Sequence, residues 1–111
     1  MVRPTKFEIA QSERDGAVVL SVTGELDMNT VEVLSERVQQ QLDAGAISLV
    51  IDLSGLAFMD SSGLRLLIAL HDRAREEVWT LRLRSPREEA ARIVLRATGA
   101  DEALPFEREP R

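Results

Sequence analysis

Two adjacent hydroxyl side chains, Ser61 and Ser62, are the residues of this sequence best placed for chemistry. They stand between Asp60 and Gly63, where a run of helical spacing begins. The first backbone amides of a helix are unpaired and favour negative charge, so they favour a phosphate on Ser62, whereas Asp60 repels it. Such a modification adds about −1.5 to −2 charges. The same residues also fit a structural role, in which Asp60 or Ser61 caps the helix and Gly63 allows close packing.

A second acidic segment, Gly24-Glu25-Leu26-Asp27, ends another predicted strand. Parallel strands joined through helices end at the same edge of a sheet, and sites in open parallel sheets concentrate there. We therefore expect Asp27 to share one edge with the segment from Ser54 to Gly63. Asp27 is either part of an interface at this edge or only a turn residue before the next helix.

Hydrophobic spacing predicts the elements that position these segments. Short β-branched or alternating runs indicate strands, and apolar residues three and four positions apart indicate helices. Strands are expected at 7–11, 17–23, 47–53 and 79–84, and helices at about 31–44, 60–76 and 86–98. The order β-β-α-β-α-β-α predicts an α/β fold with a four-stranded, mostly parallel sheet and helices packed mainly on one face.

Local signals mark the ends of these elements. Asn29 and Glu32 are spaced as a capping box before the first long helix, and Ser85 with Pro86 is typical of a helix start. The pair Asp15-Gly16 predicts the turn of a short hairpin. Glycines just beyond two helices predict where those helices stop, at Gly45 and Gly99.

The composition fits one globular domain over residues 1–111. Apolar residues make up 44% of the chain, which is enough for a single core, and charged residues make up 30%, as in ordinary globular proteins. We expect an ordered core from about residue 5 to 106. Within it, Leu104-Pro105-Phe106 is held against the body, and a frayed C-terminal tail follows. No apolar run reaches the roughly 18 residues of a membrane span, and the first residues lack a signal peptide's apolar segment. We therefore expect a cytoplasmic protein with no membrane contact. By default, we expect this protein to be a monomer.

Residue counts narrow the possible ligands. Cysteine is absent and histidine occurs once, which excludes thiol catalysis and histidine-rich zinc sites, so we expect no metal and no cofactor. Residues 1–60 carry ten acidic and four basic side chains. This acidic half argues against direct binding of nucleic acid or anionic lipid and fits a basic protein partner better.

An enzymatic function has little support in the sequence. Asp27, Asp52 and Asp60 imitate the acidic cluster of a domain phosphorylated on aspartate, but that chemistry needs a lysine at a strand end. The only lysine is Lys6, near the N-terminus. No phosphate-binding glycine-rich loop is present, and a small sheet with few aromatic residues offers no deep pocket. We predict that the chain is not an enzyme and that Asp52 is a structural hydrogen-bond acceptor.

Three motifs together closely resemble the STAS domain family, and within it the bacterial anti-sigma factor antagonists. They are Gly24-Glu25-Leu26-Asp27, Val50-Ile51-Asp52-Leu53-Ser54-Gly55-Leu56 and Phe58-Met59-Asp60-Ser61-Ser62-Gly63-Leu64. The segment from Ser85 to Phe106 also looks like the last helix and tail of that family. The resemblance therefore covers nearly the whole chain in the right order and implies a single STAS domain.

The resemblance implies a phosphorylation switch without catalysis by this chain. An unphosphorylated antagonist binds an anti-sigma factor that is also a serine kinase, which frees a sigma factor and so regulates transcription. Phosphorylation releases the antagonist, and a serine phosphatase resets it. By position, Ser62 is the acceptor, and Ser61 flanks it and caps the helix. The residues expected to bind the partner are Asp27, Phe58, Met59, Asp60, Ser61, Gly63, Leu64 and Arg65.

Two segments depart from the pattern of the relatives. Arg65 stands where many of them have glycine, and we expect it to pair with a phosphate on Ser62 and soften the switch. Glu76-Glu77-Val78-Trp79 replaces a glycine-containing turn, so Trp79 either begins the last strand or lies on the open face of the sheet. Before the helix, we expect one of Phe58 and Met59 to point inwards and the other outwards.

An alternative function exists within the same fold. STAS domains also serve as non-phosphorylated docking subunits of lipid-transport, transporter or stress-sensing complexes. In such a subunit the same helix face would be a static interface, and Ser62 would only cap the helix.

Overall fold

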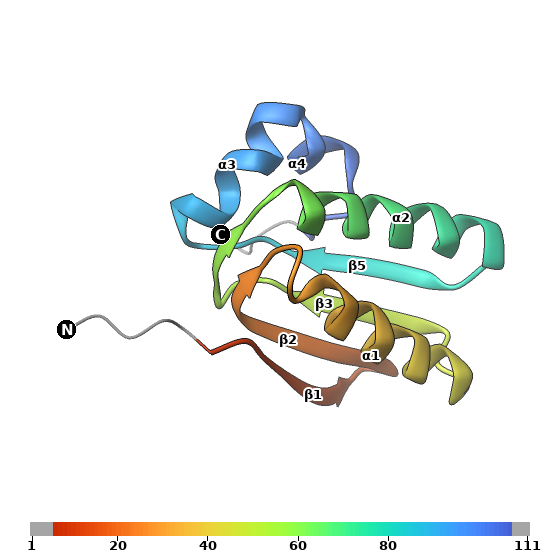
Figure 1. Ribbon diagram of the computed structural model, residues 1–111. Helices are drawn as coiled ribbons and strands as arrows, with labels where there is room; N and C mark the ends of the chain where they lie inside the picture. Colours follow the sequence, from red (N-terminus) through yellow and green to blue (C-terminus); the bar gives the residue numbers. More distant parts are fainter. Residues whose placement is uncertain (1–5, 108–111) are drawn as a thin grey trace.

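The structure is a computed structural model that describes residues 6–107, and its strands form one mixed sheet (Figure 1). β1 (Glu8–Arg14) pairs antiparallel with β2 (Ala17–Leu26). β3 (Ser48–Asp52) and β5 (Thr80–Arg84) continue the sheet in parallel, in the order β1-β2-β3-β5. The hairpin turns at residues 15–16, both with positive φ, as the Asp-Gly pair predicted.

A fifth strand, β4 (Leu56–Met59), corrects the prediction of four strands. It pairs in parallel with the end of β2, where Glu25 lies opposite Phe58 and Leu26 lies opposite Met59. The register of β2 shifts at residues 24–25, which lets one long strand pair first with β3 and then with β4. Four residues are too few to show a periodic pattern, so apolar spacing does not indicate this strand.

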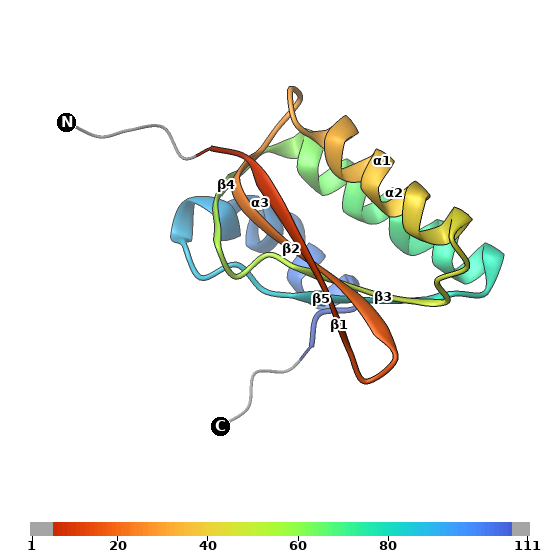
Figure 2. The ribbon, with the colours of Figure 1, turned by 90° about the horizontal axis from the view of Figure 1, so that it is seen from below.

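Two long helices cover one face of the sheet (Figure 2). They are α1 (Val31–Asp43) and α2 (Ser61–Glu77), whereas α3 (Glu89–Thr98) packs on β4 and the short α4 (Ala100–Ala103) packs on α3. The predicted one-sided helix layer is therefore confirmed. The buried core lies between this layer and the sheet, and its largest members include Leu20, Leu34, Leu49, Ile51, Leu67, Leu70 and Leu83.

Two predicted helix starts are wrong. The N-cap of α1 is Thr30 without a side-chain cap bond, because the backbone N–H of Asn29 donates instead to Asp27 Oδ1 at 2.9 Å. The N-cap of α3 is Glu88, three residues later than predicted, since Ser85 and Pro86 remain outside the helix and Pro86 is buried. The predicted stops are confirmed, with positive φ at both glycines that follow α1 and α3.

The segment after α4 is held against the edge of β5, as predicted. The N–H of Leu83 donates to the carbonyl of Pro105 at 3.0 Å, and the N–H of Glu107 donates to the carbonyl of Leu83 at 2.7 Å. Phe106 thereby forms a parallel bridge with Leu83. The predicted frayed tail lies outside the described residues. None of the helices described is long and apolar enough to cross a membrane.

The turn between α2 and β5 contains a backbone conformation that is rare for its residue type. Val78 caps α2 in the left-handed region, with φ 59° and ψ 51°, and its side chain is 87% exposed. Trp79 packs against the core beside this turn, and its indole N–H donates to Glu77 Oε1 at 3.1 Å. β5 begins at Thr80, so Trp79 neither starts the strand nor lies on the open face.

Candidate functional site

The ends of β2 and β4 bring the two predicted segments together. The two strands pair in parallel up to Leu26 and Met59, and the N–H of Asp60 then donates to the carbonyl of Leu26 at 3.2 Å. The segment at Asp27 therefore lies beside the start of α2, as predicted from the shared carboxyl edge. The contact is made by β4, which the sequence did not reveal, and not directly by β3.

The side chain of Asp60 caps α2. Its Oδ1 accepts hydrogen bonds from the N–H of Ser62 at 2.8 Å and of Gly63 at 3.2 Å. Ser61 is the first residue of the helix and is exposed, so the expectation that Ser61 is the cap is corrected. The carboxylate satisfies two otherwise unpaired amides and places a negative charge at the positive end of the helix dipole.

A close packing contact beneath the helix start explains the glycine of the motif. Gly63 is buried, and a Cβ atom at this position would lie 2.7 Å from Met59 Cγ and 2.9 Å from the carbonyl oxygen of Leu26. Any larger residue must push α2 away from the ends of the two strands. The glycine thus fixes the distance between the serines and the segment at Asp27.

The structure divides the eight predicted partner-binding residues into two groups. Met59, Gly63 and Leu64 are buried, with Met59 only 2% exposed, so they support the surface from below. Phe58 is 38% exposed, which confirms that one of the pair points inwards and the other outwards. Of the remaining members, Ser61 and Arg65 are exposed, and Asp27 and Asp60 are half-buried, as is Ser62. These five residues and Phe58 form the edge surface.

Ser62 is half-buried and opens into a groove of about 300 Å³ between the first turns of α1 and α2. Glu32 is the acidic residue that lines this groove, and Arg65 is the basic one. Nη2 of Arg65 donates to Oγ of the neighbouring Ser61 at 3.4 Å. Ser62 therefore shares this groove with one cation and one carboxylate, and lies two residues after Asp60, whose carboxylate accepts its backbone N–H.

Asp27 shapes the turn that leads into α1. Its Oδ1 accepts from the N–H of Asn29, and its own N–H donates to Oγ1 of Thr30 at 3.0 Å. The hydroxyl of Thr30 in turn donates to the carbonyl of Glu25 at 2.7 Å. The turn role is thus present in the structure, and the half-buried carboxylate remains at the edge surface.

Sequence reasoning missed two apolar side chains at this end of the molecule. Met28 is 74% exposed in the loop before α1, and Val33 is 48% exposed in the first turn of that helix. The only signal for Met28 was its place between two polar residues in a loop at the carboxyl edge.

Asp52 lies apart from the edge surface and has the predicted structural role. Its Oδ1 accepts from the N–H of Ser54 at 2.9 Å, and its Oδ2 pairs with Nη1 of Arg84 at 3.4 Å. Partial burial acts to raise the pKa of Asp52, but the hydrogen bonds from Ser54 and the charge of Arg84 outweigh it and lower the pKa.

Within residues 6–107, no three acidic, histidine or cysteine side chains gather closely enough to hold a metal ion.

Comparisons with known proteins agree with this architecture. The profile of the family described as Mlab, STAS domain matches residues 9–105. The anti-sigma-F factor antagonist RsfB of Mycobacterium tuberculosis is 32% identical over 78 residues, which are 70% of this chain and 64% of that protein. The chain thus spans less than two thirds of the length of this curated relative.

Solved structures share the same arrangement of strands and helices. An anti-sigma factor antagonist from Mycobacterium paratuberculosis superposes with a TM-score of 0.79 and 30% identity, covering 94% of this chain and 87% of that one. The anti-sigma factor antagonist SpoIIAA in its unphosphorylated form gives a TM-score of 0.70 and 25% identity, covering 94% and 90%. The phosphorylated form of SpoIIAA from Bacillus gives 0.64 and 24%, covering 94% and 93%. With a family profile that spans nearly all of the described fold, the chain belongs to the STAS domain family.

Proposed function

We propose that this chain is an anti-sigma factor antagonist whose edge surface binds an anti-sigma factor with serine kinase activity. Binding of the unphosphorylated chain frees a sigma factor, phosphorylation of Ser62 releases the chain, and a serine phosphatase restores it. The observation that carries this proposal is the position of Ser62, half-buried at the start of α2, shortly after the exposed Phe58 of β4 and the capping Asp60 in the chain. The chain is the substrate of the modification and performs no catalysis of its own.

Electrostatics at the start of α2 support release by phosphorylation. A phosphate on Ser62 places about −1.5 to −2 charges next to two carboxylates. Because Asp60 already accepts the amides of Ser62 and Gly63, the phosphate finds these donors occupied. Added charge whose nearest amide donors are occupied is costly to bury under a partner, even where Arg65 offsets part of it, so the modified surface binds less tightly.

The relatives support the same assignment. Anti-sigma factor antagonists occur among both the sequence relatives and the solved structures, and SpoIIAA has been solved in unphosphorylated and phosphorylated forms. The edge surface of this chain carries two carboxylates and the exposed side chain of Phe58, which fits a partner with an apolar patch and basic residues around it.

The test is the intact mass of the protein isolated from its own host, followed by sequencing of the modified peptide. A fraction heavier by one phosphate, with the phosphate on Ser62, is the expected result. Phosphate on Ser61 would retain the mechanism and move the acceptor by one residue. An unmodified protein under growth and stress conditions would overturn the switch and favour a static docking subunit.

A further inference from the structure

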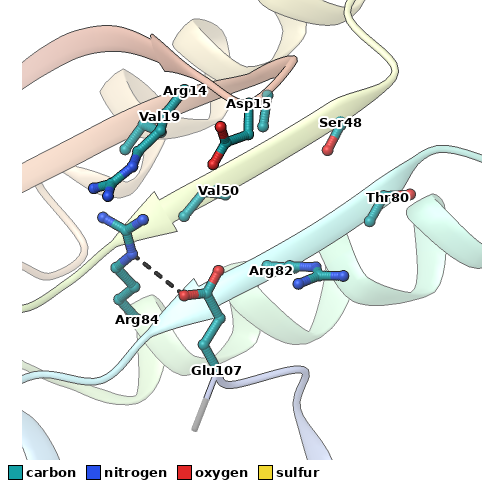
Figure 3. A pocket seen from close by; sticks show the side chains of 10 residues that line it. Arg14, Asp15, Val19, Ser48, Val50, Thr80, Arg82, Arg84 and Glu107 are labelled. Atoms are coloured by element: carbon teal, nitrogen blue, oxygen red, sulfur yellow. Dashed lines mark hydrogen bonds and ion pairs between the residues drawn. The ribbon is translucent and has the colours of Figure 1, made fainter. Parts of the chain in front are cut away.

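The sheet face opposite α1 and α2 holds a cavity of about 670 Å³, a size typical of small-molecule sites, which span roughly 300–1,000 Å³ (Figure 3). Its floor is formed by Val19 and Val50, which lie opposite each other on β2 and β3. No helix of the described residues covers this face, yet the two valines are only 4% and 6% exposed. Polar and charged side chains around the floor must therefore shield them.

Strand register shows which side chains do so. Arg82 lies in the same row across the sheet as the two valines, because it pairs with Val50. Arg14 pairs with Ala17, two residues before Val19 along β2, and Arg84 pairs with Asp52, two residues beyond Val50 along β3. The backbone positions of Arg14 and Arg84 thus lie on opposite sides of the row that contains Val19 and Val50. Figure 3 shows their side chains pointing toward one another above it.

The arginines around the cavity differ in whether a carboxylate pairs with them. Arg84 is held by two carboxylates, with Nη1 at 3.4 Å from Asp52 Oδ2 and Nε at 3.4 Å from Glu107 Oε2. Arg14 and Arg82 form no ion pair within 4 Å with any of residues 6–107, although Asp15 also lines the cavity. An anion between two guanidinium groups that point toward each other offsets their mutual repulsion.

We propose that this cavity binds a small organic anion. Its phosphate or carboxylate group lies between Arg14 and Arg84, and its apolar part lies on Val19 and Val50. The carboxylate of Glu107 already sits on Arg84 and competes with the incoming anion for that guanidinium. The site is separate from the edge surface and does not depend on the proposed switch.

Amide NMR titrations of the whole chain with inorganic phosphate and with phenyl phosphate test the proposal. We expect saturable shifts at the amides of Val19, Val50 and Arg82, tighter binding of phenyl phosphate because of its apolar ring, and weaker binding at high salt. Arg14→Gln should weaken binding at least about ten-fold. Glu107→Gln should strengthen it several-fold by removing the competing carboxylate, an effect of opposite sign that loss of folding cannot imitate.

Arg92→Gln is the matched control, since Arg92 is an exposed arginine on α3 and does not line the cavity. Its affinity for phenyl phosphate should equal that of the unmodified chain. Shifts that fail to saturate, shifts confined to other parts of the molecule, or equal affinity in the Arg14→Gln variant would each overturn the proposal. The amide spectrum of every variant also reports directly whether it is folded.

Discussion

Asp60 Oδ1 and the backbone N–H of Ser62 are joined by a hydrogen bond of 2.8 Å. The residue proposed to accept a phosphate therefore gives its own amide to a carboxylate. A free helix start attracts a phosphate, but this one already holds a negative charge at its positive end. In the proposed switch, a phosphate on Ser62 therefore crowds like charges at the edge surface.

Replacement of Asp60 by alanine removes the cap of α2 and leaves the amides of Ser62 and Gly63 without this acceptor. We expect the free energy of unfolding to fall by about 1 kcal/mol. Asp60→Asn keeps a capping oxygen and should lose much less. Urea unfolding followed by circular dichroism measures both, and an Asp60→Ala variant as stable as the unmodified chain would contradict the capping role.

The two serines should differ in their effect on the anti-sigma factor kinase. Ser62→Ala should bind the kinase but resist release by ATP, because the acceptor hydroxyl is gone. Ser62→Asp should weaken binding at least about ten-fold, since it adds a carboxylate to the groove that Glu32 lines, two residues after Asp60. Ser61→Asp is the control and should weaken binding less, because Arg65 lies beside it.

Calorimetric titration of the kinase with each variant, with and without ATP, measures these differences. Equal affinities of Ser62→Asp and the unmodified chain would count against a charge switch. A larger loss for Ser61→Asp than for Ser62→Asp would move the critical position to Ser61.

The placement of this site was predictable, but its local geometry was not. The carboxyl ends of parallel strands meet at one edge of a sheet, so the sequence alone indicates a shared surface for Asp27 and the segment before Ser62. The four-residue β4 left no periodic signal, because its pairing with the distant β2 decides it. The hydroxyl of Thr30 bonds locally to the backbone of Asp27 and Glu25, a detail that apolar spacing does not report. Ser85 and Pro86 have the local chemistry of a helix start, yet Pro86 is buried and α3 begins later.

Arg65 should weaken the switch, because it is the cation that lines the groove of Ser62. Its Nη2 now donates to Oγ of Ser61, a partner that a phosphate on Ser62 should displace. Arg65→Gln should therefore increase the loss of kinase affinity on phosphorylation several-fold, whereas Arg65→Lys keeps the charge and should resemble the unmodified chain. Affinities of phosphorylated and unphosphorylated forms of each variant test this, and an unchanged ratio in Arg65→Gln would remove the pairing.

Stability at acidic pH should depend on Asp52. Its pKa is lowered in the folded chain, since Ser54 and Arg84 stabilise the carboxylate more than burial disfavours it. A lowered pKa contributes stability above the unfolded value of about 3.9, and this contribution is lost as pH falls through the folded pKa. The free energy of unfolding should thus fall more steeply below about pH 4 in the unmodified chain than in Asp52→Asn.

Urea unfolding at a series of acidic pH values gives the two slopes. Asp72→Asn is the control, because Asp72 is exposed and forms no ion pair with the residues described here. If Asp52→Asn kept the full slope of the unmodified chain, the stabilising effect of the ionised carboxylate would be excluded.

Val78 offers a direct test of stored backbone strain. A β-branched residue in the left-handed region costs roughly 1–2 kcal/mol, and the side chain gains little in return because it is 87% exposed. Val78→Gly removes the strain, although glycine also raises the entropy of the unfolded chain. The net expectation is a gain of about 0.5–1 kcal/mol in the free energy of unfolding. Val78→Ala relieves less of the backbone strain and serves as the control. A Val78→Gly variant that is less stable than the unmodified chain would mean that the valine side chain stabilises the turn.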